Sequence, residues 1–188
     1  MKRREPRITR KSHYGKAFEG EVRNSLRYCQ DLSRGEFYWF RLMDFMDFYA
    51  INPHMQARHQ PCDFIFMRKG TCYMLECKCT VQPSFPFDFV TDHQMNSMES
   101  WVRAGGKSYL IIKNDLRRQE ERSRVYAIPI EKYMTLRAST SALGRKSLKW
   151  EELSSISKEL PELKSKIWCL TPLWEEPKRY TLGQLQRG

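Results

Sequence analysis

Asp63, Glu76 and Lys78 are the residues whose types and spacing best suit chemistry at a metal ion. Asp63 opens the apolar run 63–67 (DFIFM), while Glu76 and Lys78 lie two positions apart in the run 72–78 (CYMLECK). Both runs have the length and composition of β-strands. Two carboxylates that such strands bring together repel each other unless something compensates their charge. A divalent cation such as Mg²⁺ does so, because it accepts carboxylate oxygens and keeps positions for water and a phosphate.

The turn between the two runs determines how the carboxylates meet. Lys69 and Gly70 suit a two-residue hairpin turn, in which glycine readily adopts a positive φ. The register of this hairpin predicts Asp63 opposite Glu76, with Cβ atoms about 4.5–5.5 Å apart. Lys78 lies one pleat beyond Glu76 on the same face. An ammonium group there can position a nucleophilic water and offset charge developing at phosphorus, as a nuclease requires.

The second run is expected to be a central strand that is covered on both faces. Alternation places Cys72 and Met74 on the face of Glu76, and charges on a covered strand are usually functional or paired. The alternative is that Asp63 is an ordinary turn residue and that Glu76 belongs to a solvated face. The opposite face of the strand is also apolar and carries Tyr73, Leu75, Cys77 and Cys79.

Composition favours one globular domain that binds a polyanion. The chain has 188 residues, of which 40% are hydrophobic and 29% charged, and its net charge is +11. This charge favours DNA, RNA or an anionic membrane surface as the partner. No apolar run approaches the roughly 20 residues that cross a bilayer, and no hydrophobic segment follows the basic N-terminus. We therefore expect no membrane segment, a cytoplasmic protein and reduced cysteines.

The excess positive charge is concentrated in two segments. Residues 1–27 hold nine basic residues against three glutamates, and residues 132–150 hold five basic residues and no acid. The alternative to DNA contact is a solvated tail and a solvated loop. We interpret both segments as DNA-binding because compensating acids are nearly lacking. The candidate contacts from these segments are Lys11, Lys16, Arg23, Arg145 and Lys146.

The order of expected elements indicates an α/β fold with a mixed sheet flanked by helices. We expect a flexible basic arm over 1–13 and one domain over 14–188, in which 46–60 form a loop or short stalk. Little regular structure is expected near the C-terminus. Helices are predicted over 15–35, 89–104 and 130–136, strands over 36–45, 63–67, 72–78, 107–113 and 124–129, and a loop over 82–88.

The sequence resembles a known nuclease family over roughly residues 14–153. Pro61-Cys62-Asp63 followed by Glu76-Cys77-Lys78 resembles the PD-(D/E)xK nuclease signature, and an ordered series of further motifs is similar to the RecU-type Holliday junction resolvases. The series is far more specific than E-x-K alone. It comprises residues 15–19 (GKAFE), 73–78 (YMLECK), 84–86 (SFP), 92–94 (DHQ), 105–106 (GG), 144–148 (GRKSL) and 152–153 (EL).

The resemblance implies a restriction-endonuclease-like core and a Mg²⁺-dependent endodeoxyribonuclease, with Mn²⁺ as the alternative metal. It also implies a homodimer whose paired sites nick opposed strands of a branched DNA, the four-way junction. Where the family often has a hydroxyl residue, this chain has Pro61, so a backbone carbonyl replaces that ligand or the ligand is lost. The implied site residues are Asp63 and Glu76 as metal ligands, Lys78 as transition-state stabiliser, Gln94 completing the metal site, and Glu19, or Glu21 as fallback, from the first helix.

Residues beside the implied site are candidates for DNA contact. Ser84 can contact a phosphate, and Phe85, with Phe87 and Phe89, can stack on an unpaired base. Core packing beneath a loop is the alternative for these aromatics.

Three other functions remain open from the sequence. The same metal chemistry fits a restriction-type nuclease that cuts duplex DNA, and the charge alone fits a junction-binding protein without catalysis. A zinc-binding module is disfavoured because the spacing does not match paired zinc knuckles. Its ligands would come from Cys62, Cys72, Cys77 and Cys79 with His54 or His59.

Overall fold

The computed structural model describes residues 10–42, 60–115 and 123–175. The expected stalk over 46–60 therefore lies outside the described residues except for residue 60, as do residues 1–9 of the expected arm. The elements in chain order are α1 (Arg10–Leu32), β1 (Phe37–Arg41), β2 (Phe64–Arg68), β3 (Thr71–Thr80), β4 (Ser84–Pro86), η1 (Phe87–Phe89), α3 (Asp92–Arg103), β5 (Lys107–Asn114), β6 (Arg124–Pro129), α4 (Ile130–Ala142), β7 (Ser147–Lys149), α5 (Trp150–Ile156), β8 (Lys158–Glu159), β9 (Glu162–Lys164), β10 (Ile167–Trp168) and η3 (Thr171–Leu173).

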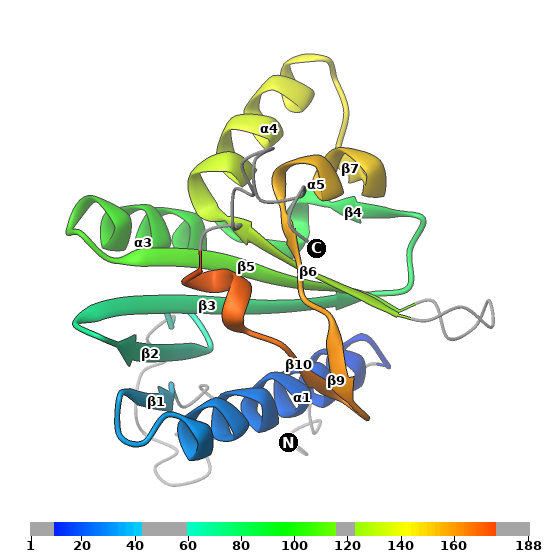
Figure 1. Cartoon of the computed structure of the whole chain (residues 1–188). Helices are drawn as coiled ribbons and strands as arrows, with labels where there is room; N and C mark the ends of the chain where they lie inside the picture. The colour runs from blue at the N-terminus through cyan, green and yellow to red at the C-terminus, as the bar shows by residue number, and fades with distance from the viewer. Residues whose placement is uncertain (1–9, 43–59, 116–122, 176–188) are drawn as a thin grey trace, which may run out of the picture.

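A mixed sheet of six strands forms the centre of the molecule, in the order β1-β2-β3-β5-β6-β8. Helix α1 covers one face, and α3, α4 and α5 lie on the other (Figure 1). Strands β3 and β5 run parallel, whereas the other neighbouring pairs of this sheet are antiparallel. The predicted α/β fold with a mixed sheet flanked by helices is confirmed.

The hydrophobic core is divided by the sheet into two layers. Phe18, Val22 and Leu26 recur along α1 at helical spacing and pack with Leu75 of β3. Met74, the next residue back along β3, points the other way and packs in the second layer. The alternation predicted from the sequence is thus confirmed, and β3 is covered on both faces.

The β2–β3 hairpin has the register predicted from its turn. Arg68 pairs with Thr71, and the pairing continues to Phe64 and Leu75. The two turn residues, Lys69 and Gly70, have φ angles of 47° and 76°. Positive φ at both positions matches the twist of the flanking strands, and only glycine adopts it without strain.

Three elements differ from their predicted bounds. Helix α1 already begins at Arg10 and ends at Leu32, so it takes in part of the expected arm. Helix α3 begins only at Asp92, because Thr91 caps it in a reciprocal capping box. Helix α4 continues to Ala142.

The structure also corrects two segments that were expected to lack strands. Ser84–Pro86 forms β4, which pairs with β7, although 82–88 was predicted to be a loop. Pro86 is tolerated because this sheet has only two strands, so one side of each strand needs no ladder partner. The C-terminal part folds into α5 and the short strands β8, β9 and β10, whose lengths are too small to show a sequence period.

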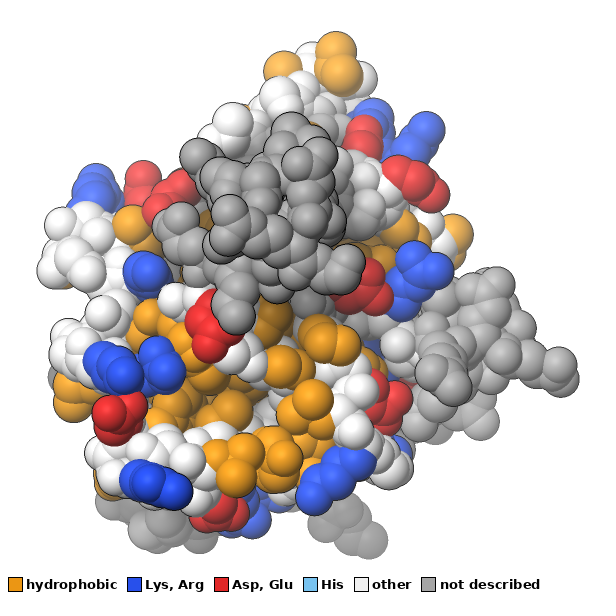
Figure 2. All heavy atoms as spheres, viewed as in Figure 1, with side chains coloured by type: hydrophobic (Ala, Val, Ile, Leu, Met, Phe, Trp, Pro, Cys, Tyr) orange, Lys and Arg blue, Asp and Glu red, His pale blue; other side chains and the backbone are white. Residues whose placement is uncertain are grey.

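The described surface has mixed charge on the face seen in Figure 2. Lys and Arg side chains alternate there with Asp and Glu around a central area of hydrophobic side chains (Figure 2). Across the described ranges, no helix is long and apolar enough to cross a membrane.

Candidate functional site

Asp63 lies immediately before β2 and leaves the regular ladder of the hairpin. Its N–H donates to the Leu75 carbonyl at 3.0 Å, and its carbonyl accepts from the Leu42 N–H at 2.9 Å. The carboxylate Oδ2 accepts the Cys77 N–H at 2.7 Å. The predicted direct pairing of Asp63 with Glu76 is therefore corrected. The Asp63 carboxylate, one residue before the last ladder pair of Phe64 with Leu75, accepts the Cys77 N–H of β3 in place of a backbone carbonyl.

Glu76 is the most buried acid of the site, with 2% of its surface exposed. Its Oε1 lies 2.6 Å from Lys78 Nζ and accepts the Gln94 Nε2–H at 2.6 Å. Its Oε2 is buried and has no hydrogen-bond partner among the described residues. A buried carboxylate oxygen without a partner is costly, so this atom is the strongest local indication that the site suits a cation.

Gln94 is oriented by the start of α3. Its Oε1 accepts the Thr91 N–H at 3.2 Å in the capping box, and this fixes the amide so that Nε2 faces Glu76. A metal ligand would have to offer the oxygen instead, because the amide nitrogen carries only donors. In this geometry Gln94 orients Glu76, and direct ligation of a metal by Gln94 stays a prediction.

Helix α1 sends its two candidate acids in different directions, because residues two apart point about 200° apart around a helix. Glu19 lies 3.5 Å from Arg41 and close enough to Glu76 that its charge raises the pKa of that carboxyl. Glu21 is buried and bound by Lys113 Nζ at 2.7 and 2.8 Å and by the Trp168 indole N–H at 3.1 Å. The structure thus favours Glu19 over Glu21 as the acid of α1 that faces the site, whereas Glu21 belongs to a buried ion pair with Lys113.

The electrostatics of the site disfavour full ionisation of the two carboxylates without a cation. Burial, followed by the charge of Glu76, raises the pKa of Asp63 to about 7 from 3.8, although the Cys77 N–H and Lys78 oppose the change. Burial also raises the pKa of Glu76, against the attraction of Lys78. A divalent cation would relieve both effects.

The donor set fits a hard cation that keeps water ligands. Asp63 and Glu76 supply carboxylate oxygens, and within the described ranges no group of three or more His, Cys, Asp and Glu side chains is placed to hold a metal. Mg²⁺ usually binds through one or two carboxylates and retains several waters. Burial raises the pKa of the Cys62 and Cys77 thiols, which keeps them neutral and makes them poor zinc ligands.

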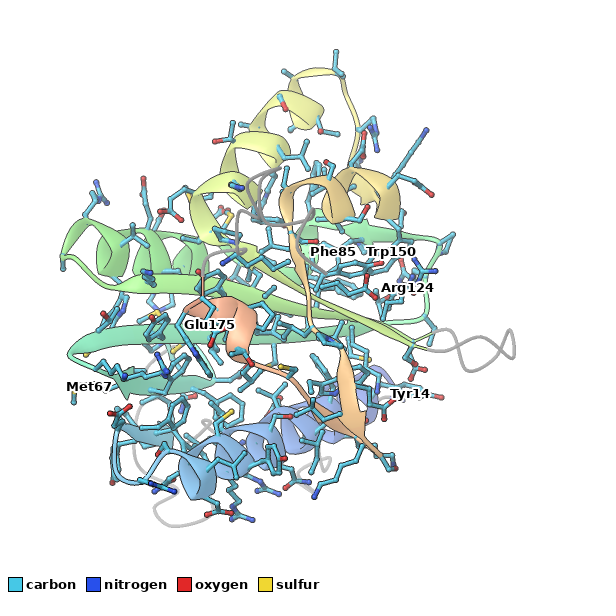
Figure 3. The ribbon with its side chains drawn as sticks, viewed as in Figure 1. Tyr14, Met67, Phe85, Arg124, Trp150 and Glu175 are labelled. Carbon is cyan, nitrogen blue, oxygen red and sulfur yellow. The ribbon has the colours of Figure 1, made fainter. Side chains whose placement is uncertain are left out.

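A cleft of about 430 Å³ opens where β3 ends. Tyr14, Lys16 and Glu19 of α1 line one side, and Lys78 with its neighbours in β3 lines another. Figure 3 shows Tyr14 at the end of α1 that borders this cleft. The cleft gives a substrate access to Lys78 and Glu19 together.

Comparison with known families identifies the family of this chain. Residues 43–170, more than half of the chain, match the family model described as Recombination protein U, or RecU. The chain belongs to the RecU family. The resemblance seen in the sequence is confirmed, and Asp63, Glu76, Lys78 and Gln94 lie inside the matched region. Glu19 precedes that region, so its assignment depends on the geometry described above.

No curated protein sequence matches this RecU-family chain. Among solved structures, the Holliday junction resolvase Hjc from the archaeal hyperthermophile Archaeoglobus fulgidus is similar, with a TM-score of 0.43 and 14% sequence identity. The similarity covers 77% of the RecU-family chain and 95% of Hjc.

The predicted DNA contacts of the RecU-family chain occupy different environments. Lys16 and Arg23 are exposed on α1, Lys146 is exposed before β7, and Ser84 is half-buried in β4. Lys11 belongs to α1, but its side chain lies outside the described residues.

Arg145 is engaged within the protein. Its guanidinium makes a forked contact with Glu152 at 2.6 and 2.8 Å and donates to the Ser147 carbonyl at 3.1 Å. These bonds connect the start of β7 to α5, so the structure shows a bracing role for Arg145 and its DNA contact stays a prediction.

Phe85 is a core residue, which corrects its assignment as a base-stacking group. None of its side chain is exposed, and its ring centroid lies 5.7 Å from Phe89, 6.2 Å from Tyr133 and 6.4 Å from Trp150. Figure 3 shows Phe85 beside Trp150. The structure therefore favours the core-packing alternative.

Sequence reasoning missed one residue at the site, Arg41. It ends β1 opposite Phe64, and its charge opposes the rise that burial and Glu76 cause in the pKa of Asp63. The available signal was its position as the first basic residue of the aromatic strand, but its approach to Glu19 depends on how α1 packs against β1.

Proposed function

We propose that this RecU-family protein is a divalent-metal-dependent endonuclease that resolves four-way DNA junctions as a homodimer. The observation that carries the proposal is the buried Glu76 Oε2, which has no hydrogen-bond partner among the described residues. Its carboxylate neighbours Asp63 and contacts Lys78, which lines the cleft. Membership of the RecU family supports the choice of a four-way junction as the substrate.

Asp63 and Glu76 would hold Mg²⁺, or Mn²⁺ as the alternative. When bound, the ion lowers the pKa of its water and offsets negative charge on the phosphate. The Cys77 N–H fixes the Asp63 carboxylate, and Gln94 fixes Glu76 from the other side. The Lys78 ammonium, held by Glu76 Oε1, orients the attacking water and stabilises the negative charge on the oxygens of the pentacoordinate transition state. The expected products carry a 5′-phosphate and a 3′-hydroxyl.

DNA binding would rest on exposed basic residues, of which Lys16 lines this cleft. Lys16 and Arg23 of α1 and Lys146 are exposed, and the chain carries a net charge of +11. Release of counterions from the phosphates makes such binding weaken steeply as salt rises. Two subunits would present two cleavage sites to the opposed strands of one junction.

The experiment is a cleavage assay that compares a four-way junction with a linear duplex of matched sequence, with Mg²⁺ and with EDTA. We expect paired nicks in the junction only with Mg²⁺, and no cleavage by Asp63→Asn. Glu36→Gln, which removes an exposed carboxylate far from the cleft, is the control and should cleave normally.

Other outcomes would overturn the proposal in distinct ways. Equal cutting of junction and duplex would indicate a duplex-cutting nuclease of the restriction type. Tight junction binding with no metal-dependent cleavage would indicate a binding protein without catalysis.

A further inference from the structure

A second cavity, of about 240 Å³, lies between α1 and the β1–β2 edge of the sheet. Its volume is that of roughly eight waters at ~30 Å³ each, enough for a phosphodiester group. Its charged side chains comprise three cations and one carboxylate, so it favours an anion. The lining consists of Lys16, Glu19, Gly20 and Arg23 from α1, Arg41 from β1 and Phe64 from β2.

This basic pocket adjoins the candidate metal site. Arg41 pairs across the ladder with Phe64, the residue that follows Asp63, and the Leu42 N–H donates to the Asp63 carbonyl. Glu19 lines both the pocket and the cleft at the end of β3. A strand lying over Asp63 with one phosphate at the metal site therefore has the basic pocket beside its next phosphates.

Glu19 orients Arg41, one of the three cations of the pocket, and the pocket still carries a net positive charge. The Glu19 carboxylate lies 3.5 Å from the Arg41 guanidinium. A guanidinium presents several N–H donors in a fixed plane, so a carboxylate on one side leaves others to receive a phosphate. With Lys16 and Arg23, the formal charge of the lining is +2.

Gly20 is the second observation that points to a ligand. A glycine inside a helix costs about 1 kcal/mol relative to alanine. Nothing in the fold requires it, because a Cβ built at Gly20 meets no atom within 4 Å and its φ is not positive. The absence of a side chain at Gly20 leaves open space in the pocket, and this space allows the backbone of a ligand to approach α1 closely.

We propose that Lys16, Arg23 and Arg41, over the bare helix backbone at Gly20, bind a phosphate next to the scissile one in the DNA strand. The inference rests on the proposed nuclease function for the position of the scissile phosphate. Binding the neighbouring phosphate fixes the strand along its length and so aligns the scissile group with Lys78 and the carboxylates. Arg41 is thus a positioning residue.

The first test fills the pocket without removing a charge. Gly20→Met places a flexible side chain in the open space, and Gln30→Met adds the same side chain to an exposed position of α1 away from the pocket. We expect Gly20→Met to weaken junction binding in EDTA at least tenfold, with Gln30→Met unchanged. Equal affinities for the two variants would overturn the proposal.

The second test removes charge from the DNA one phosphate at a time. Single methylphosphonate substitutions are scanned along one strand of the junction, and binding is measured for the wild type and for Arg41→Gln. At one position beside the cleavage site, the neutral linkage should weaken the wild type about tenfold and Arg41→Gln by less than twofold. If the loss of affinity from Arg41→Gln multiplies with the loss from the neutral linkage at every position, the pocket is excluded as a phosphate site.

These readouts separate the pocket from the nuclease. Binding in EDTA does not require cleavage, so a wild type that never cuts would refute the proposed function while the methylphosphonate scan still reports on the pocket. The pocket alone would be refuted if the wild type cuts normally and the losses of affinity from Arg41→Gln and from the neutral linkage multiply at every position.

Discussion

Replacing Asp63 by asparagine should make the metal-free protein more stable while it abolishes cleavage. The folded protein binds a proton on Asp63 more tightly than the unfolded chain does, because its pKa rises from 3.8 to about 7. Stability of the metal-free wild type therefore falls as pH rises through the window from about 4 to about 7. Asparagine removes the charge, and its Oδ1 can still accept the Cys77 N–H.

The size of the effect follows from the pKa. A change of about three units at about 1.4 kcal/mol per unit corresponds to ~4 kcal/mol above pH 7. Because Asp63 is only half-buried, water screens part of this cost, and ~4 kcal/mol is an upper limit. Below pH 4 the carboxyl is protonated in both states, so the gain should vanish there.

The assay is urea unfolding in EDTA at pH 4.0 and pH 8.0 for the wild type, Asp63→Asn and the exposed control Glu36→Gln. We expect a gain of about 2–4 kcal/mol for Asp63→Asn at pH 8 only, and less than ~1 kcal/mol for the control at either pH. Mg²⁺ at pH 8 should stabilise the wild type and leave Asp63→Asn nearly unchanged. A gain independent of pH, or a loss of stability at pH 8, would refute the reasoning.

Three further predictions concern catalysis, the buried ion pair and the core. Lys78→Met should reduce the rate of junction cleavage, measured in single turnover, by about 10²–10³-fold. An unchanged single-turnover rate would remove Lys78 from the mechanism. Lys113→Met should cost about 3–5 kcal/mol in urea unfolding because it strands the buried Glu21, and adding Glu21→Gln should recover part of this loss. Phe85→Ala should cost about 3–5 kcal/mol, and cleavage per folded molecule should persist, whereas weakened binding at full stability would restore the stacking role.

The hairpin and its charged residues could be predicted because the interactions that form them are local. Two adjacent strands, a turn with glycine at the required place and strict alternation determine which side chains of β3 share a face. These same features predicted Glu76 and Lys78 together, and the structure joins them at 2.6 Å.

The parts that could not be predicted depend on distant segments. Phe85 is buried because β4 pairs with β7, whose residues lie some sixty positions later in the chain. Gln94 is turned toward Glu76 by the capping box of α3. The spacing of Thr91 and Gln94 predicts such a cap, but not that the Gln94 amide meets Glu76 across the fold. Asp63 leaves the β2–β3 ladder, since its N–H donates to the Leu75 carbonyl while its own carbonyl accepts the N–H of Leu42, which follows β1.

The contacts of Trp168 with α1 bear on the order in which the protein becomes active during synthesis. Its backbone N–H donates to the Ser25 hydroxyl at 2.8 Å, and its indole N–H donates to Glu21 at 3.1 Å. Both partners lie on the helix that also presents Glu19. We therefore expect a nascent chain to lack both of these contacts of the first helix until residue 168 has left the ribosome.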